Sequence, residues 1–119
     1  MARTPESPPD PAEVLQVTTT LGSQVDAERI GRILVEERLA ACAQIIGPVS
    51  SVYWWEEGVE SAREWYCHLK TVAERFDGLL TRLRSLHPYE VAEIIAVPVT
   101  RISPEYAHWV AQSVRLPSS

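Results

Sequence analysis

Five large aromatic rings lie within fourteen consecutive positions of this chain. They occupy two runs of strand-like composition on either side of Glu57–Gly58, a turn dipeptide, and so predict a β-hairpin. A chain of 119 residues has too little core to bury five rings that project from one hairpin. We therefore expect part of the set to pack against another copy of the chain; the rings are Tyr53, Trp54, Trp55, Trp65 and Tyr66.

The patterns around the hairpin predict alternating strands and helices. Strand-like runs cover residues 14–20, 43–56, 59–71 and 93–99, and helical periodicity follows residues 23 and 71. Ser23 with Asp26, and Thr71 with Glu74, both resemble capping boxes. Pro104 opens a short terminal helix at the favoured first position. The order β-α-β-β-α-β predicts the α+β class and a ferredoxin-like sandwich with an extended hairpin and a C-terminal helix.

The hairpin is too long and too apolar for a sheet that is covered on one side only. Its strands of thirteen to fourteen residues exceed the usual length of about 5–6, and Gly47–Pro48 predicts a bulge or an edge position. If Glu56 lies opposite Val59, both faces are apolar, whereas a half-covered sheet should alternate apolar and polar residues. In that register one face carries Ile46, Val52, Trp54, Trp65, Cys67 and Leu69, and the other carries Ile45, Val49, Tyr53, Trp55, Tyr66, His68 and Lys70.

The same register keeps the two cysteines apart. It places Cys67 opposite Pro48, six residues along the strand from Cys42. That separation is about 20 Å, whereas a disulfide needs Cα atoms within about 7 Å. Two free thiols indicate a reducing compartment. The N-terminus has no secretory pattern and no apolar run approaches the ~20 residues of a membrane span, so we expect a cytoplasmic protein with no membrane partner.

Charge and motif content argue against several classes of function. The net charge is −5, and the hairpin itself is acidic, so the aromatic rings do not form a nucleic-acid platform. The chain has no Gly-x-Ser-x-Gly elbow, no Walker loop and no dinucleotide fingerprint. We therefore expect a protein that is not an enzyme and carries no organic cofactor.

The ordered part of the chain is expected to be one domain. Residues 1–12 contain four of the nine prolines and almost no residue to bury, which predicts a disordered tail. We expect the folded domain over residues 13–113 and a frayed C-terminal tail over residues 114–119.

Several motifs, in this order and spacing, resemble the CutA divalent-cation tolerance family. The resemblance covers about residues 14–112 and implies a ferredoxin-like subunit in a tight homotrimer, which is cytosolic and linked to tolerance of copper and other divalent metals. Two soft donors found in some members are replaced here by Thr19 and Leu86. The matching runs are residues 37–48 (ERLAACAQIIGP), 51–56 (SVYWWE), 69–71 (LKT), 87–90 (HPYE) and 93–99 (EIIAVPV).

A metal role is one of two interpretations of His87 in the His-Pro-Tyr motif. A trimer could bring His87 of one subunit near Cys42, Glu90 or Glu93 of another, and imidazole, carboxylate and thiolate together suit copper or zinc. The alternative is a hydrogen bond from His87 that orients the turn at Pro88. Packing as a small buried side chain is likewise the alternative for Cys42.

A second candidate site combines Trp55, Lys70, Tyr89 and Glu93 at a subunit boundary. These residues could form a small polar pocket for a metal or an anion, or an inter-subunit Lys–Glu ion pair with a tyrosine hydrogen bond. Two other functions stay open: a trimer that senses a small molecule in its inter-subunit clefts, and a scaffold that binds a partner protein. For the trimer interface itself we expect Tyr53, Trp54, Trp65 and Tyr66.

Overall fold

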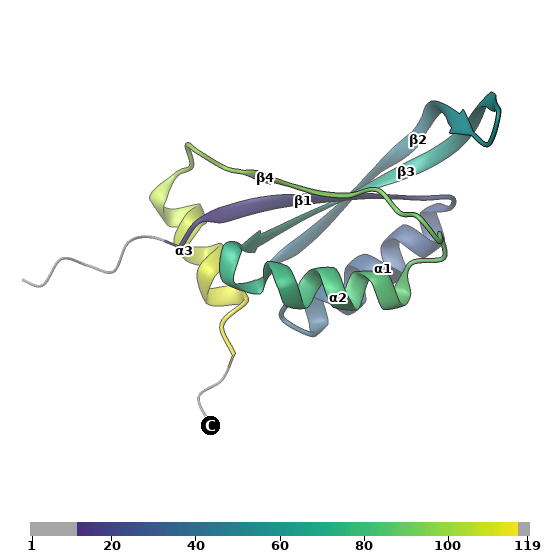
Figure 1. Ribbon diagram of the computed structural model, residues 1–119. Coiled ribbons are helices and arrows are strands. Elements are labelled where there is room, and N and C mark those ends of the chain that lie inside the picture. The colour runs from purple at the N-terminus through teal and green to yellow at the C-terminus, as the bar shows by residue number, and fades with distance from the viewer. Residues whose placement is uncertain (1–11, 117–119) are drawn as a thin grey trace, which may run out of the picture.

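The predicted α+β order is confirmed by the computed structural model, which describes residues 12–116 (Figure 1). A 3₁₀ turn at Ala73–Arg75 precedes the second helix. Along residues 12–116, none of the helices is long and apolar enough to cross a membrane. The elements are β1 (Val14–Leu21), α1 (Gln24–Glu36), β2 (Cys42–Trp55), β3 (Gly58–Val72), α2 (Phe76–Leu86), β4 (Ile94–Pro98) and α3 (Pro104–Ser113).

The four strands form one antiparallel sheet in the order β2-β3-β1-β4. Helices α1 and α2 lie side by side on one face of this sheet (Figure 1). β1 ends at Leu21, opposite Trp65 of β3, so the hairpin beyond that point pairs only with itself. We call this two-stranded extension, residues 49–64, the arm. The arm projects away from both helices, as the predicted length of the hairpin required (Figure 1).

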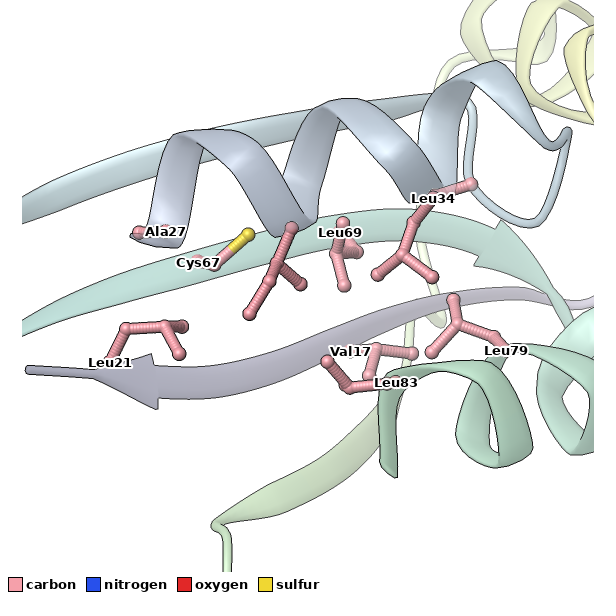
Figure 2. Packing of buried hydrophobic residues seen from close by; sticks show 10 residues of the cluster. Val17, Leu21, Ala27, Leu34, Cys67, Leu69, Leu79 and Leu83 are labelled. Atoms are coloured by element: carbon pink, nitrogen blue, oxygen red, sulfur yellow. The ribbon is translucent and has the colours of Figure 1, made fainter. Parts of the chain in front are cut away.

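The main core lies between the sheet and the two helices (Figure 2). Val17, Thr19 and Leu21 alternate along β1 and are fully buried against this side. They meet apolar residues spaced one helical turn apart, the pattern of an amphipathic helix. Burial of this apolar area, at about 25 cal/mol per Å², is the main force that holds the helices to the sheet. The helical residues are Ala27, Ile30 and Leu34 of α1 and Leu79 and Leu83 of α2.

A second cluster lies under α3. Val14 and Val72 pair across β1 and β3 and point away from α1 and α2, since strand residues alternate between faces. They pack with Val110 and Val114 of the terminal helix and its cap. Thus α3 covers one end of the sheet face that the other helices leave free. Val114, which we expected in the C-terminal tail, is buried, so packing continues to at least that residue. Of the two predicted tails, the described residues also include Ala12, Arg115 and Leu116, and the rest lies outside them.

The hairpin register differs from the predicted one. Trp55 pairs with Gly58, so Glu56 and Glu57 form the turn, and Glu56 adopts a left-handed φ of 54°. The predicted bulge is confirmed between Ile46 and Val49. Because it inserts an extra residue, Ile46 joins Tyr66 on the free face and Ile45 joins Cys67 on the helix side, the reverse of our expectation.

The two cysteines are free, as predicted, although the reasoning used the wrong register. Cys67 lies opposite Ile45, three residues along β2 from Cys42 rather than six. Three residues still separate Cys42 from the position opposite Cys67 by about 10 Å along the strand, which exceeds the Cα separation that a disulfide allows.

The first predicted capping box has the expected N-cap and the second does not exist. The Ser23 Oγ accepts a hydrogen bond from the Asp26 backbone N–H at 3.1 Å, at the start of α1. Thr71 instead stays inside β3, and its hydroxyl donates to the Leu39 carbonyl at 2.7 Å. α2 begins after the 3₁₀ turn with no side-chain cap. The sheet ladder and the bond to the Leu39 carbonyl therefore outweigh the local capping signal of Thr71.

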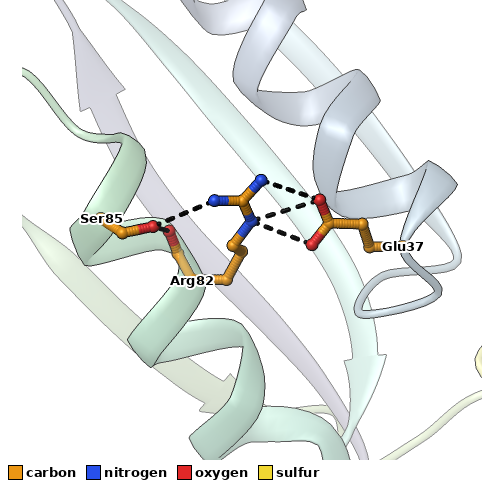
Figure 3. Close-up of polar contacts among 3 residues, drawn as sticks. All are labelled: Glu37, Arg82 and Ser85. Carbon is orange, nitrogen blue, oxygen red and sulfur yellow. Dashed lines mark hydrogen bonds and ion pairs between the residues drawn. The ribbon is translucent and has the colours of Figure 1, made fainter.

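An ion pair ties the end of α1 to α2 (Figure 3). The Arg82 guanidinium donates from Nε and Nη2 to the Glu37 carboxylate, with 2.9 Å between Nη2 and Oε2, and its Nη1 also bonds the Ser85 hydroxyl. Hydrogen bonding to Arg82 lowers the pKa of Glu37. The planar guanidinium meets the carboxylate in the bidentate geometry that arginine favours.

Gly47→Ala is expected to destabilise the protomer by about 1–3 kcal/mol, because the new methyl group overpacks the bulge. An ideal Cβ there would lie 2.5 Å from the Trp65 ring and 3.0 Å from the Glu64 carbonyl. Urea unfolding measures the change. Gly58→Ala is the matched control, since a Cβ at Gly58 meets no atom within 4 Å, and we expect it to change the free energy of unfolding by less than about 0.5 kcal/mol. Equal effects of the two substitutions would contradict this account of the bulge.

Candidate functional site

The arm exposes large apolar side chains that nothing in residues 12–116 covers. Trp54 is 75% exposed, Val52 71% and Trp55 57%. Isolated exposed apolar residues are ordinary, but a contiguous exposed group marks an interaction surface. The arm is therefore the first candidate surface for contact with another molecule.

The sheet face away from α1 and α2 continues the side of the arm that carries Tyr53 and Trp55, and we call it the open face. Three rows of paired residues cross it, one per two-residue step along the strands. Ile46, Ile95 and Val97 on this face are each about half exposed. The rows are Cys42–Lys70–Gln16–Val97, Gln44–His68–Thr18–Ile95 and Ile46–Tyr66–Thr20.

The four residues predicted for the trimer interface do not share one environment. Tyr53 and Trp54 lie on the exposed arm, and Tyr66 lies on the open face, where its ring stacks on His68 with centroids 5.4 Å apart. Trp65 instead points to the helix side, is half-buried and packs against the main core. Its indole also covers Gly47 at the bulge. Within one protomer, Trp65 therefore packs against the core, whereas Tyr53, Trp54 and Tyr66 lie on the surface.

Both ring nitrogens of His87 are engaged within the protomer. Nε2 lies 3.0 Å from the Thr20 carbonyl and 3.0 Å from the Thr19 hydroxyl. Since a carbonyl only accepts, Nε2 carries the proton, and Nδ1 accepts the Tyr89 backbone N–H at 3.1 Å. Burial lowers the pKa of His87, which keeps the ring neutral. This geometry favours the role in which His87 orients the turn at Pro88.

Tyr89 joins the same turn to the base of the arm. Its hydroxyl donates to the Glu64 carboxylate at 3.0 Å, and its ring meets the His87 ring at 4.9 Å. Burial, and then the bond to Glu64, raises the pKa of Tyr89 to about 12. A phenol with this pKa stays protonated at neutral pH and remains a donor. A chain of contacts thus runs from β1 through His87 and Tyr89 to Glu64 of β3.

The four residues of the predicted polar pocket lie apart in one protomer. Lys70 donates to the Gln44 amide oxygen at 2.8 Å, in the row nearest α3. Glu93 precedes Ile94, which pairs with Thr19, so it lies at the other end of the open face, about 13 Å along the strands from Lys70. Trp55 is near the tip of the arm and Tyr89 is in the turn after α2. These four side chains could meet only if different copies of the chain contributed them.

The predicted metal ligands are also scattered. Cys42 is half-buried, with its Sγ 3.6 Å from the Tyr106 hydroxyl, and lies at least about 10 Å along the strands from the Thr19 and Thr20 partners of His87. Over residues 12–116, no group of three or more His, Cys, Asp or Glu side chains is placed to hold one metal ion. Burial raises the pKa of Cys67 to about 11, so this thiol stays protonated at neutral pH.

Three residues of this region were not predicted as parts of a site. Thr19, considered only as a lost metal donor, is a hydrogen-bond partner of His87. Glu64 holds Tyr89, and His68 lies at the centre of the open face. Alternation along β3 did place His68 and Tyr66 on one face; nothing in the sequence indicated the Thr19 or Glu64 contacts, which join residues 68 and 25 positions apart.

Comparison with known proteins gives one consistent result. Residues 15–113 match the family model described as CutA1 divalent ion tolerance protein. Protein CutA of Mus musculus is 40% identical over 102 residues, which cover 86% of this chain and 58% of the mouse protein. The divalent-cation tolerance protein CutA of Thermus thermophilus is 38% identical over 97 residues, 82% of this chain and 94% of that protein. The chain thus spans a little over half of the mouse relative and nearly all of the bacterial one.

Solved structures agree with this match. The divalent ion tolerance protein CutA1 of Ehrlichia chaffeensis superposes with a TM-score of 0.85 at 30% identity, covering 88% of this chain and 98% of that one. The protein of Archaeoglobus fulgidus, named periplasmic divalent cation tolerance protein CutA, gives 0.83 at 33% identity, covering 86% and 99%. The chain therefore shares its fold with these two proteins over nearly their whole length.

Proposed function

The chain belongs to the CutA1 divalent ion tolerance family, and on that premise we propose that it forms a homotrimer that binds a divalent cation at its subunit boundaries. Copper is the leading candidate cation. We further propose that the protein acts in the cytoplasm by binding rather than catalysis, with no nucleic-acid or membrane partner. The observation that carries the proposal is the group of exposed rings on the arm, together with the open face.

Assembly follows from the surface that one protomer leaves uncovered. Tryptophan and tyrosine are the residues that most often anchor protein interfaces, and Trp54, Trp55 and Tyr53 are all exposed on the arm. β2 is an edge strand along its whole length, and an exposed edge favours pairing with another chain. The family resemblance supports three as the number of copies.

Cation binding in this proposal requires donors from two subunits. Glu90 and Glu93 are exposed, and within residues 12–116 neither takes part in an ion pair. Cys42 offers a half-buried thiol. His87 could join them only by giving up its bond to the Tyr89 amide or to β1. The same boundary would hold the polar pocket of Trp55, Lys70, Tyr89 and Glu93, with Lys70 of one subunit facing Glu93 of another.

Light scattering on the purified protein tests the assembly. We expect a mass three times that of the protomer at micromolar concentration. A monomer under these conditions would contradict the trimer. Calorimetric titration then tests binding with Cu²⁺, Zn²⁺ and common nucleotides, of which we expect the metal ions alone to give heat. Nucleotide binding without metal binding would favour the sensing alternative instead.

The proposed ligands are tested by substitution. We expect Cys42→Ser and Glu93→Gln each to weaken Cu²⁺ binding about 10-fold or more in the titration, since each removes a donor. Glu105→Gln, an exposed glutamate at the start of α3, is the control that keeps wild-type affinity. Wild-type affinity in both ligand variants would show that the cation binds elsewhere.

A further inference from the structure

His68 lies at the centre of the open face, in the middle one of its three rows. Its neighbours across the strands are Thr18 of β1 and Gln44 of β2, both uncharged. Two half-exposed isoleucines lie on the same face. Ile46 is in the adjoining row, and Ile95 is at the far end of the row that contains His68. The direct neighbours of the imidazole are therefore uncharged, on a face that a single protomer leaves uncovered.

The hydrogen bonds of His68 define its neutral form. Nδ1 lies 2.9 Å from the Thr18 hydroxyl and 3.4 Å from the Gln16 amide nitrogen, which can only donate. Nδ1 is therefore an acceptor, and the proton of the neutral ring is on Nε2. A second proton, on Nδ1, would remove this acceptor and force Gln16 and Thr18 to reorient.

The ionisable groups around His68 do not compensate a positive charge well. Lys70 lies on the same face of β3 and adds a like charge, while Tyr66 stacks its ring on the imidazole and Cys42 lies in the adjoining row. Among the described residues, Glu93, directly before β4, is the one carboxylate that acts on His68, and no hydrogen bond or ion pair joins the two. Burial, and then Lys70, lowers the pKa of His68, and Glu93 opposes the shift.

We propose that His68 makes the association of protomers sensitive to pH, because a neutral ring can be buried between copies and a protonated ring cannot. The inference rests on the proposed trimer and adds a means of regulating it. Burying a charge without a partner is costly, and a histidine responds by losing its proton.

The direction and size of the effect follow from proton linkage. Covering the open face further disfavours the charged ring, so the pKa of His68 is lower in the trimer than in the free protomer. Free protomers then bind more protons, and association weakens as pH falls below the protomer pKa. With one His68 per subunit, dissociation takes up as many as three protons, so the dissociation constant rises by up to about 10³-fold per pH unit.

Analytical ultracentrifugation of wild-type protein and His68→Gln between pH 8 and pH 5.5 tests the inference. Glutamine stays neutral and can still accept from Thr18. We expect wild-type association to weaken at least about 10-fold over this range and the variant to change less than about threefold. His108→Gln, an exposed histidine of α3, should keep the wild-type pH dependence. Circular dichroism at each pH confirms that the protomers stay folded.

Each outcome separates the two proposals. A trimer of equal stability at pH 8 and pH 5.5 overturns the role of His68 and leaves the trimer intact. The same pH dependence in His68→Gln as in wild type also overturns that role. A wild-type protein that is already monomeric at pH 8 overturns the trimer, and this inference with it.

Discussion

Trp54→Ala is expected to abolish most of the association between protomers while each protomer stays folded. Trp54 is 75% exposed and pairs with Val59 near the tip of the arm, so its truncation removes little from the protomer. An interface tryptophan typically contributes about 2–4 kcal/mol, and the substitution occurs once in every subunit. We therefore expect light scattering to show mainly monomer at micromolar concentration, with wild-type secondary structure.

Two matched substitutions make this result specific. Val25→Ala removes an equally exposed apolar side chain, 72% exposed, from the helix side, and should leave association unchanged. Trp65→Ala should act on the protomer itself, because Trp65 packs on the core and on Gly47, and truncation of a buried aromatic costs about 3–5 kcal/mol. Half-burial places Trp65 near the low end of that range. A Trp54→Ala protein that remains fully trimeric would refute the arm as the interface.

His87→Ala is expected to lower the free energy of unfolding by about 2–4 kcal/mol. The substitution leaves the buried Thr19 hydroxyl and the Thr20 carbonyl without their partner, and each unsatisfied buried group costs about 1–3 kcal/mol. It also frees the Tyr89 amide, so the turn between α2 and β4 loses its anchor. Urea denaturation measures the loss.

The pH dependence of stability gives a second readout for His87. Because burial lowers its pKa in the folded protein, the unfolded chain takes up a proton first as the solution is acidified. Wild-type stability is therefore fully present above the unfolded pKa of about 6.5 and is lost as pH falls through the folded value. His87→Gln should flatten this dependence. The lowered pKa of His68 makes stability depend on pH in the same direction. The effect of His87→Gln is therefore measured in a protein that already carries His68→Gln.

The His87→Ala variant also discriminates between the two roles of His87. If the ring orients the turn, His87→Ala loses stability and association while Cu²⁺ affinity per folded trimer is retained. If the ring is a metal ligand, affinity falls and the apo-protein keeps wild-type stability. The bonds to Thr19, Thr20 and Tyr89 predict the first result.

Strand and helix assignments could be predicted from sequence because they depend on local spacing. Leu79 and Leu83 repeat at one helical turn, and Ser103 followed by Pro104 begins α3 as expected. Thr71 shows where local signals fail. Thr71 does not cap a helix, because it pairs within the sheet and its hydroxyl donates to the Leu39 carbonyl. That partner is 32 residues away, so no local pattern contains it.

The candidate site was less predictable, because it depends on register and on distant contacts. One bulged residue at Gly47–Pro48 moved Ile46 to the open face and Ile45 to the helix side, since side chains alternate at every step. The residues predicted for a metal or a polar pocket are present, but Cys42, Lys70 and Glu93 lie at different places on the sheet. Their convergence depends on other copies of the chain.

By itself, the sequence determined the order of the elements, the family and the excess of aromatic rings on one long hairpin, because periodicity, motif spacing and composition are properties of neighbouring residues. Only the tertiary structure decided that Trp65 belongs to the core, that His87 is held by β1 and that His68 occupies the centre of the open face. Those three facts depend on which strands pair and in what register, and pairing is fixed by packing over the whole chain.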